Sequence, residues 1–324
     1  MTAQPLALAV DLGGTTYGLG LLDRQGTLLA QDSRPTPQDC TGEALLTELA
    51  MGARRLAEAQ APGAALAGLG VGIPGPVDPA SGTIRQCPNL HCLDGVNAVE
   101  HLSRAAGVPA YIGNDAFCAT LAELRYGAGR ECDNMVMLTL GTGVGGGIAL
   151  GNRVLRGPRQ IMGEVGHLIV VPEGGPKCGC GNHGCLEALV GRQAIVDAAV
   201  SRLEAGEASA LMHEAVSGYD HITPRHVADL AREGDHLCLE IMDQVGMYVG
   251  LAICNIIVLC DPDQVVLGGG IAAAGDVLFE PIRRTVAHRS RISGFDPARI
   301  VPAELGNLAG VYGAGALVWE HTDA

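Results

Sequence analysis

The sequence predicts an α/β protein with two domains, each built on a partly parallel sheet. Apolar stretches of strand length alternate with stretches in which apolar residues recur at helical spacing. The chain of 324 residues exceeds one ordinary core and suits two domains of roughly 100–200 residues each. A pattern of strand, glycine turn and strand starts at Val10 and returns at Leu138. We interpret the return as a second, related domain; two unrelated hairpins with similar turns are the alternative.

The first half begins with three strands in residues 6–31, separated by a glycine turn and an Asp-Arg-Gln-Gly turn. Beyond them, helical spacing of apolar residues predicts helices, and short apolar runs predict strands. In order, these are a helix over Leu45–Ala59, a buried strand over 66–75, a helix over Asn97–Ala106, a strand over 108–113 and a helix over Asp115–Tyr126.

The second half opens with "NMVMLTLGTGVGGGIALGNRVL" (134–155), which again predicts strand, glycine turn, strand and turn. The most apolar long segment, Val245–Cys260, is too short to span a bilayer and predicts a buried helix. The other expected elements are helices over Gln193–Leu203 and Pro224–Glu233, one long helix over Leu237–Cys260, a strand in "QVVLGGGIA" (264–272), and an apolar segment, Leu308–Glu320, that packs back onto the body.

Composition restricts the partners of the chain. The net charge is −14 and Lys177 is the only lysine, so nucleic acid and anionic membrane surfaces are disfavoured as partners. An anionic substrate then needs backbone amides, arginine or a bound cation. The N-terminus shows no basic segment followed by an apolar stretch and a cleavage site, so we expect a cytoplasmic protein. Eight of the 11 cysteines are scattered and are expected to be reduced core residues.

Three glycine-rich loops could cradle phosphates, because backbone N–H groups without a neighbouring Cβ can approach an anion. They are 11–16 ("DLGGTT"), 141–147 ("GTGVGGG") and 267–272 ("LGGGIA"), each directly after an apolar strand. Taken singly, each also fits an ordinary glycine hairpin. The sequence has no G-x-x-x-x-G-K-[ST] motif, and the residues after 141–147 alternate like a strand, which disfavours a dinucleotide fingerprint.

Two acids stand where phosphoryl transfer would need them. Asp11 ends a buried strand beside a phosphate loop, and a Mg²⁺ ion between them would remove the repulsion; an ordinary turn residue is the alternative. Asp115 follows Asn114 between a strand and a helix. The pair could be a helix N-cap, or Asp115 could accept a proton from a substrate hydroxyl while Asn114 orients it.

A cysteine cluster, "KCGCGNHGCLE" (177–187), lies in the middle of the chain. Cys178, Cys180 and Cys185 with His167 upstream match the ligand set of a closed tetrahedral zinc site, whose role would be structural. A disulfide would leave one of the three thiols unpaired, and the C-x-x-C spacing of a redox pair is absent. Two acids bracket the cluster, Glu164 before it and Glu187 at its end.

These residues together resemble the ROK family of bacterial sugar kinases and sugar-responsive repressors. The resemblance rests on "DLGGTT", "GIPGPVD", the "ND" of Asn114–Asp115, "GTGVGGG", "ExGH" (Glu164–His167), "CxCGxxGCxE" (Cys178–Glu187) and "LGGG". It implies an actin-like/hexokinase-like (ribonuclease H-like) fold of two α/β domains with the active site in the cleft between them. We place the smaller domain at 1–113 plus 305–324, and the larger, zinc-bearing domain at 114–304.

The resemblance also implies roles for individual residues. Asp115 is the expected catalytic base. The expected sugar contacts are Gly75, Asn89, Asn114, Asp115, Glu164, His167 and Glu187. The expected zinc ligands are His167, Cys178, Cys180 and Cys185. The expected nucleotide contacts are Asp11, Gly13, Gly14, Thr15, Thr16, Gly141, Thr142, Gly143, Gly145, Gly268, Gly269 and Gly270.

The function implied is ATP- and Mg²⁺-dependent phosphorylation of a hexose, most simply glucose at the 6-hydroxyl. Kinases for N-acetylmannosamine, N-acetylglucosamine, fructose or allose are the alternatives, because the same motifs serve them. A non-catalytic regulator is disfavoured, since the "DLGGT" strand begins within about ten residues of Met1 and leaves no space for a preceding DNA-binding domain. A homodimer or homotetramer is the expected assembly. Departures from the family pattern, at Gly113, Phe117, 157–162 and 90–95, lie near the sugar pocket and concern which hexose is used.

Overall fold

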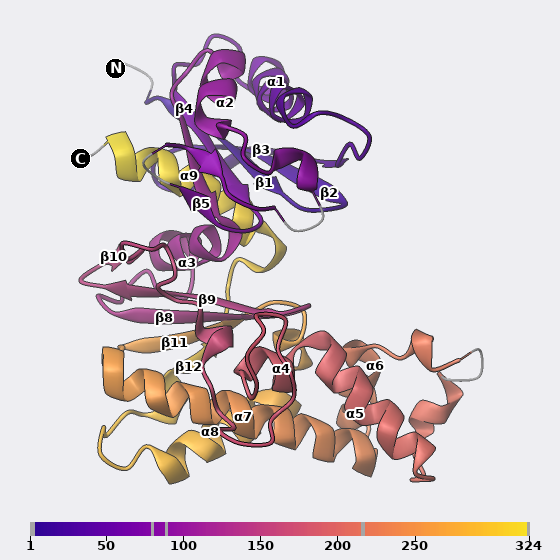
Figure 1. Ribbon diagram of the computed structural model, residues 1–324. Coiled ribbons are helices and arrows are strands. Elements are labelled where there is room, and N and C mark those ends of the chain that lie inside the picture. The colour runs from indigo at the N-terminus through magenta and orange to yellow at the C-terminus, as the bar shows by residue number, and fades with distance from the viewer. Residues whose placement is uncertain (1–3, 79–80, 88–89, 215–217, 323–324) are drawn as a thin grey trace. The chain divides into compact units, whose positions relative to one another are not determined.

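The computed structural model describes residues 4–78, 81–87, 90–214 and 218–322. The chain divides into two compact units. Unit 1 comprises Met1–Glu131, Arg156–Met162 and Glu304–Ala324, and unit 2 comprises Cys132–Leu155 and Gly163–Ala303. Figure 1 follows the chain through both.

Unit 1 is built on a five-stranded sheet whose strand order is β3-β2-β1-β4-β7. The first three strands pair antiparallel, and β1, β4 and β7 run parallel. The strands are β1 (Leu6–Leu12), β2 (Thr16–Leu22), β3 (Leu28–Pro35), β4 (Leu66–Ile73) and β7 (Ala110–Asn114), and a short pair, β5 (Val77–Asp78) with β6 (Thr83–Ile84), stands apart.

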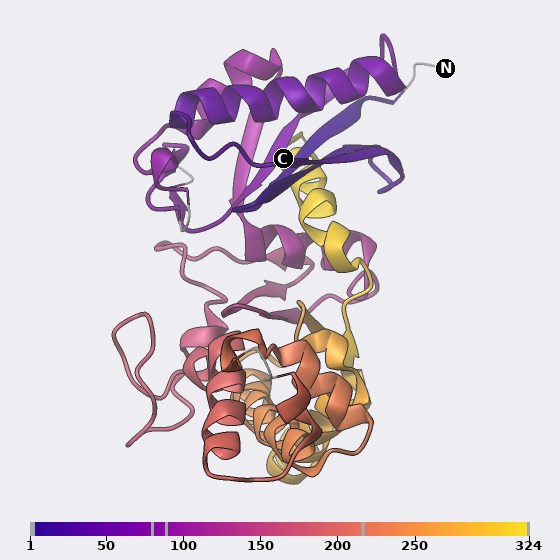
Figure 2. The ribbon, with the colours of Figure 1, turned by 90° about the vertical axis from the view of Figure 1, so that its right-hand side faces the viewer.

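Helices cover both faces of this sheet (Figure 2). Leu8 and Val10 of β1 join one core with helix α1 (Gly42–Gln60), to which α2 (Ala98–Ala106) also contributes. The alternate residue Ala9 packs with helix α9 (Ala309–Thr322) on the opposite face, as the two-residue period of a strand requires. α9 lies close because β4 carries Gly70, where a Cβ would stand 1.7 Å from the Ala314 carbonyl oxygen. The expected return of the last segment is confirmed.

Helix α3 (Asp115–Tyr126) belongs to unit 1, where it packs mainly against α9. Its buried Glu123 accepts hydrogen bonds from the backbone N–H groups of Ala128, Glu304 and Leu305 at 2.8, 3.1 and 2.9 Å. These bonds join the end of α3 to the segment that leads into α9. Unit 1 therefore extends to Glu131, beyond residue 113 where the sequence placed the domain boundary.

Unit 2 repeats the sheet of unit 1. Its strand order is β10-β9-β8-β11-β12, with an antiparallel β8–β9–β10 meander and parallel β8, β11 and β12. The strands are β8 (Met135–Leu140), β9 (Val144–Leu150), β10 (Arg153–Val154), β11 (Gln264–Gly268) and β12 (Ile300–Pro302). The shared topology favours two related domains over two unrelated hairpins.

The helices of unit 2 surround α7 (His236–Cys260), which packs against α8, α6, α4 and α5. α7 is long and apolar enough to cross a membrane, but it supplies the centre of the unit 2 core, as expected of a buried helix. The other helices are α4 (Leu186–Val190), α5 (Arg192–Glu204), α6 (Pro224–Arg232) and α8 (Asp276–Arg289). The sequence did not predict α8, whose interior contains Pro281.

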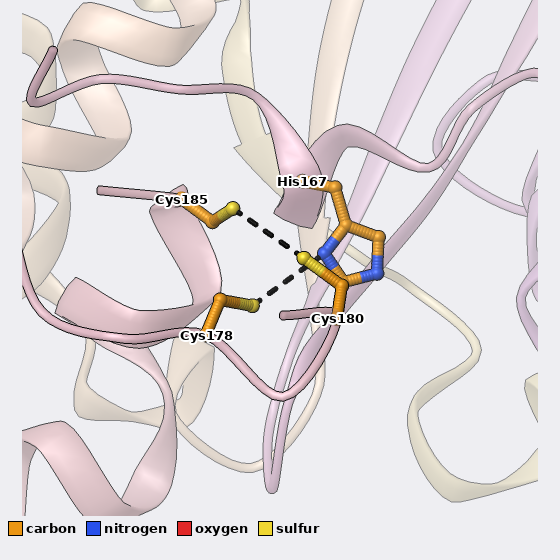
Figure 3. Close-up of side chains that lie close together, drawn as sticks. All are labelled: His167, Cys178, Cys180 and Cys185. Atoms are coloured by element: carbon orange, nitrogen blue, oxygen red, sulfur yellow. Dashed lines mark hydrogen bonds between the residues drawn. The ribbon is translucent and has the colours of Figure 1, made fainter. Parts of the chain in front are cut away.

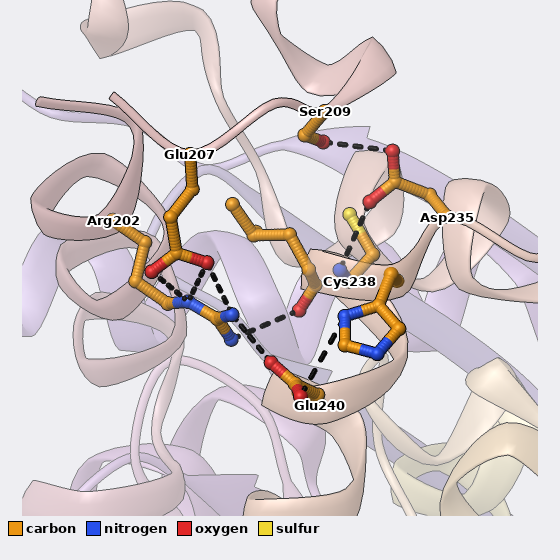
Figure 4. Close-up of polar contacts among 8 residues, drawn as sticks. Arg202, Glu207, Ser209, Asp235, Cys238 and Glu240 are labelled. Carbon is orange, nitrogen blue, oxygen red and sulfur yellow. Dashed lines mark hydrogen bonds and ion pairs between the residues drawn. The ribbon is translucent and has the colours of Figure 1, made fainter. Parts of the chain in front are cut away.

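An ion-pair network joins α5 to the start of α7 (Figure 4). Arg202 of α5 binds Glu207 in the following loop and Glu240 of α7. Nearby, Asp235 caps α7 by accepting from the Cys238 N–H and also accepts from the Ser209 hydroxyl at 2.9 Å. The network holds the loop after α5 against α7.

Candidate functional site

Asp11 of β1 stands in a cradle of glycines in unit 1. Its neighbours in the sheet are Gly18 on β2 and Gly72 on β4. On the side of α9, a Cβ at Gly310 would lie 2.2 Å from Asp11 Oδ2, so only glycine leaves room for the carboxyl. Burial, and secondarily the charge of Asp115, raise the pKa of Asp11 to about 6.

Asp115 is the first residue of α3, directly after β7. Its Oδ1 accepts hydrogen bonds from the side-chain amide of Asn114 at 2.9 Å and from the backbone N–H of Ala116 at 2.8 Å. Burial raises the pKa of Asp115, and these hydrogen bonds oppose the shift. Asn114 also caps α3 by accepting from the Phe117 N–H at 3.0 Å. The N-cap interpretation is therefore confirmed, and the same residue orients the acid.

The 11–16 loop joins β1 to β2 beside these acids. Its backbone is held by hydrogen bonds from Gly13 N to Thr16 O, from the Thr36 hydroxyl to Gly13 O, and from the Gln38 amide to Gly14 O, at 2.8–2.9 Å. Thr15 and Thr16 are exposed, so their hydroxyls are free to meet a ligand from solvent. Gly75, another expected contact in unit 1, has a φ of +89° and its carbonyl faces Asn114 at 3.5 Å.

The other two glycine loops lie against each other at the ends of β8 and β11 in unit 2. The backbone N–H of Ile271 donates to the Leu140 carbonyl at 3.0 Å. Gly269 has a φ of +87°, and a Cβ there would lie 2.3 Å from the same carbonyl oxygen. The expected nucleotide contacts of this unit therefore gather at one edge of its sheet: Gly141, Thr142, Gly143, Gly145, Gly268, Gly269 and Gly270.

His167, Cys178, Cys180 and Cys185 converge in unit 2, and their ligand atoms all lie within 4.8 Å of one another (Figure 3). Cys180 Sγ is 3.7 Å from Cys185 Sγ, and Cys178 Sγ is 3.7 Å from His167 Nδ1. Ligands at about 2.3 Å from a tetrahedral zinc ion would stand about 3.8 Å apart. The four side chains therefore fit the expected ion in both donor type and spacing.

The acids that bracket the cluster differ in their surroundings. Glu164 is exposed and precedes the short helical turn that ends at His167. Glu187, in the first turn of α4, points to the 141–147 loop, where its Oε2 accepts from the Val144 N–H at 3.0 Å. Its Oε1 lies 3.6 Å from Cys178 Sγ. Asn89 lies outside the described residues.

Sequence reasoning missed three contributors to these sites. Cys118 is fully buried in α3 beside Asp11, where burial raises the pKa of its thiol above the usual range. The Arg156 guanidinium lies 3.9 Å from the centre of the Phe117 ring, two residues after Asp115. Arg232 of α6 donates to the carbonyls of Ala274 and Ala273 at 3.0 and 2.8 Å, just beyond the 268–270 loop. None of the three stands within a motif that signals such contacts.

Known proteins resemble this chain over nearly its full length. The sequence model of the ROK family matches residues 7–321. A glucokinase from Halalkalibacterium halodurans is 34% identical over 315 residues, which are 96% of this chain and 94% of the relative. A ROK hexokinase from Thermus thermophilus superposes with a TM-score of 0.82 at 34% identity, covering 98% of this chain and 100% of the other. A ROK family glucokinase from Streptomyces griseus, crystallised with glucose and AMPPNP, gives a TM-score of 0.77 at 30% identity and covers 97% and 99%.

Proposed function

The chain belongs to the ROK family and has the two-domain actin-like fold of its sugar kinases, and we propose that it is an ATP-dependent hexose kinase that phosphorylates glucose at the 6-hydroxyl. The observation that carries the proposal is the position of Asp115, which Asn114 orients at the start of α3 beside Asp11. A carboxylate held in this way can take the proton from an attacking hydroxyl.

Asp115 acts as the general base in this proposal. Burial raises the pKa of its carboxyl, and a higher pKa makes the carboxylate a better proton acceptor. The hydrogen bond from Asn114 fixes Oδ1, which leaves Oδ2 to receive the substrate proton. The remaining proposed sugar contacts, which hold the ring hydroxyls, are Gly75, Asn89, Asn114, Glu164, His167 and Glu187.

The three glycine loops hold the nucleotide in this proposal, with ATP as phosphoryl donor. Their backbone N–H groups and the hydroxyls of Thr15, Thr16 and Thr142 are suited to phosphate oxygens. Asp11 is the residue that would hold Mg²⁺, since its carboxyl lies beside the 11–16 loop, where a cation would remove the repulsion between the carboxylate and a phosphate. A bound Mg²⁺ would supply neutralisation of the developing phosphate charge. An ion held by Asp11 would also lie close to Asp115, because the two carboxyl groups are neighbours.

A structural zinc ion at His167, Cys178, Cys180 and Cys185 belongs to the same proposal. The donor set and its spacing support zinc, and the four protein ligands complete a tetrahedral shell. The role of the ion would then be to hold His167 and the neighbouring Glu187 in place. Metal analysis of the purified protein should find one zinc per chain. A protein without metal that retains full sugar affinity would contradict this role.

The activity is tested by a coupled ADP-release assay on glucose, mannose, fructose, allose, N-acetylglucosamine and N-acetylmannosamine. We expect the highest kcat/KM on glucose. Preference for an N-acetylhexosamine would move the assignment to that substrate class within the family. No turnover on any of the six would reject a kinase and leave a sugar-binding regulator, which calorimetry with glucose would then reveal.

Assembly and location complete the proposal. We infer a homodimer or homotetramer in the cytoplasm, with no nucleic acid or membrane partner. The net charge of −14 supports the last point, and the burial of α7 within unit 2 agrees with it. Light scattering of the purified protein tests the assembly, because the monomer mass is 33.3 kDa.

A further inference from the structure

We propose that the cysteine cluster controls nucleotide binding through helix α4, with Glu187 as the positioning residue. The proposal rests on the proposed function, because it takes the 141–147 loop to be a nucleotide contact. It assigns to the metal site an effect on the phosphoryl donor, in addition to the effect on sugar contacts. All residues in the argument belong to unit 2.

The start of α4 is fixed by the cluster. Cys185, a candidate metal ligand, is the N-cap residue of the helix. The next residue, Leu186, donates its N–H to the Leu168 carbonyl at 2.9 Å, and Leu168 directly follows the candidate ligand His167. Ile169 and Cys185 form an isolated antiparallel bridge. A metal that joined His167 to Cys185 would therefore hold both sides of this contact.

Helix α4 and the residues that join it to α5 contact the 141–147 loop. At the start, Glu187 Oε2 accepts from the Val144 N–H at 3.0 Å, and a Cβ at Gly143 would lie 2.3 Å from the same oxygen. Just beyond α4, the N–H of Arg192, the first residue of α5, donates to the Gly141 carbonyl at 3.0 Å. A Cβ at Gly191 would lie 3.2 Å from the Thr142 carbonyl oxygen. Hydrogen bonds thus hold the loop at Gly141 and Val144, and Gly191 and Glu187 closely approach Thr142 and Gly143 between them.

A helix as short as α4 has little stability of its own, so its position depends on what anchors it. The cysteine cluster anchors the start of α4, and the position of α4 in turn determines where the 141–147 loop lies. A thiol that ligates a metal loses its proton, so in the loaded protein the connection runs through Cys185 and the α4 backbone. It does not need the contact between Cys178 Sγ and Glu187 Oε1. Because Glu187 accepts the Val144 N–H, a shift of α4 changes the direction in which that N–H points.

The test measures ADP binding by calorimetry in the absence of sugar, so that neither catalysis nor the sugar contacts enter. Wild type, Glu187→Gln, Glu187→Ala and the exposed control Glu173→Ala are each measured with zinc and after zinc removal by a chelator. We expect zinc removal to weaken ADP binding by about tenfold in wild type and Glu173→Ala, the size of one lost charge-assisted hydrogen bond. Glu187→Gln should keep most of the response, because its amide oxygen can still accept from Val144.

Glu187→Ala should bind ADP as weakly as zinc-free wild type and should not respond to zinc. The proposal is overturned if Glu187→Ala loses as much affinity on zinc removal as wild type, or if Glu187→Gln loses its response. Circular dichroism reports whether each variant is folded, and Glu187→Gln carries the test if the alanine variant is not. Wild type that binds ADP and phosphorylates glucose, but ignores zinc, rejects this inference alone. Wild type that neither binds ADP nor phosphorylates a sugar rejects the proposed function.

Discussion

The side-chain amide of Asn114 donates a 2.9 Å hydrogen bond to Asp115 Oδ1, so the residue that caps helix α3 also orients the acid at its start. If Asp115 is the base, Asp115→Asn should lower kcat about 10²–10⁴-fold, the contribution of a positioned general base. Glucose binding, measured by calorimetry, should stay near the wild-type level. The exposed variant Asp39→Asn is the matched control. A wild-type rate in Asp115→Asn would place the base elsewhere.

The burial of Asp11 predicts a pH dependence of stability. Its pKa is about 6 in the folded protein against an ordinary value of 3.8, so the folded state holds the proton more tightly than the unfolded state. The cost of the ionised carboxyl is therefore absent below pH 3.8 and fully present above pH 6, where it amounts to about 3 kcal/mol.

Asp11→Asn removes this cost, so it should raise the melting temperature at pH 8 in metal-free buffer. The gain should shrink as the pH falls towards 4. Cys118 and Asp115 are the titratable groups that face Asp11. Asp39→Asn again serves as the control, because its side chain is exposed. An unchanged melting temperature at pH 8 would contradict the buried, ionised state of Asp11.

Replacing Glu123 should cause a large loss of stability while leaving the groups proposed for catalysis unchanged. Three backbone N–H groups donate to the Glu123 carboxylate, and all three would lose this acceptor in Glu123→Ala. An N–H left without a partner away from water costs about 1–3 kcal/mol. We expect a loss of about 3–5 kcal/mol by urea unfolding. Glu131→Ala, at an exposed site, should change little. A loss below about 1 kcal/mol would show that water replaces the carboxylate.

Glu123 and the cysteine cluster show where sequence reasoning succeeds and fails. The cluster was predictable because three of its ligands are close in sequence and their spacing is specific to metal sites. Strands β1, β2, β8, β9 and β11 were predictable because glycine turns bound their apolar runs. Glu123 stands at an apolar helix position, and its partners Glu304 and Leu305 are remote in the sequence. Helix α8 was missed because it contains Pro281, and a proline inside a segment argues against a helix. In the folded protein, packing against α7 supports the helix despite the proline. The sequence could not decide whether Asn114 caps α3 or orients Asp115. The side chain does both, because its oxygen accepts from the Phe117 N–H while its amide nitrogen donates to Asp115.

Replacing Arg232 should weaken the use of ATP without affecting the use of glucose. Its guanidinium holds the carbonyls of Ala273 and Ala274, which follow the 268–270 loop. Arg232→Met should raise KM for ATP by about tenfold, as expected when charge-assisted hydrogen bonds are lost, and leave KM for glucose unchanged. The control is Arg225→Met, whose side chain is 88% exposed on the same helix. A parallel rise in both KM values would indicate a general loss of structure instead.

The glucose kinase activity is tested most directly by identifying what the purified protein forms from glucose, ATP and Mg²⁺. Phosphorus NMR distinguishes the position of the ester on the sugar, and the same sample gives the ADP formed. We expect stoichiometric glucose 6-phosphate and ADP from wild type, and almost none from Asp115→Asn at equal concentration and reaction time. ATP consumption without a sugar phosphate, or equal product from both proteins, would contradict this expectation.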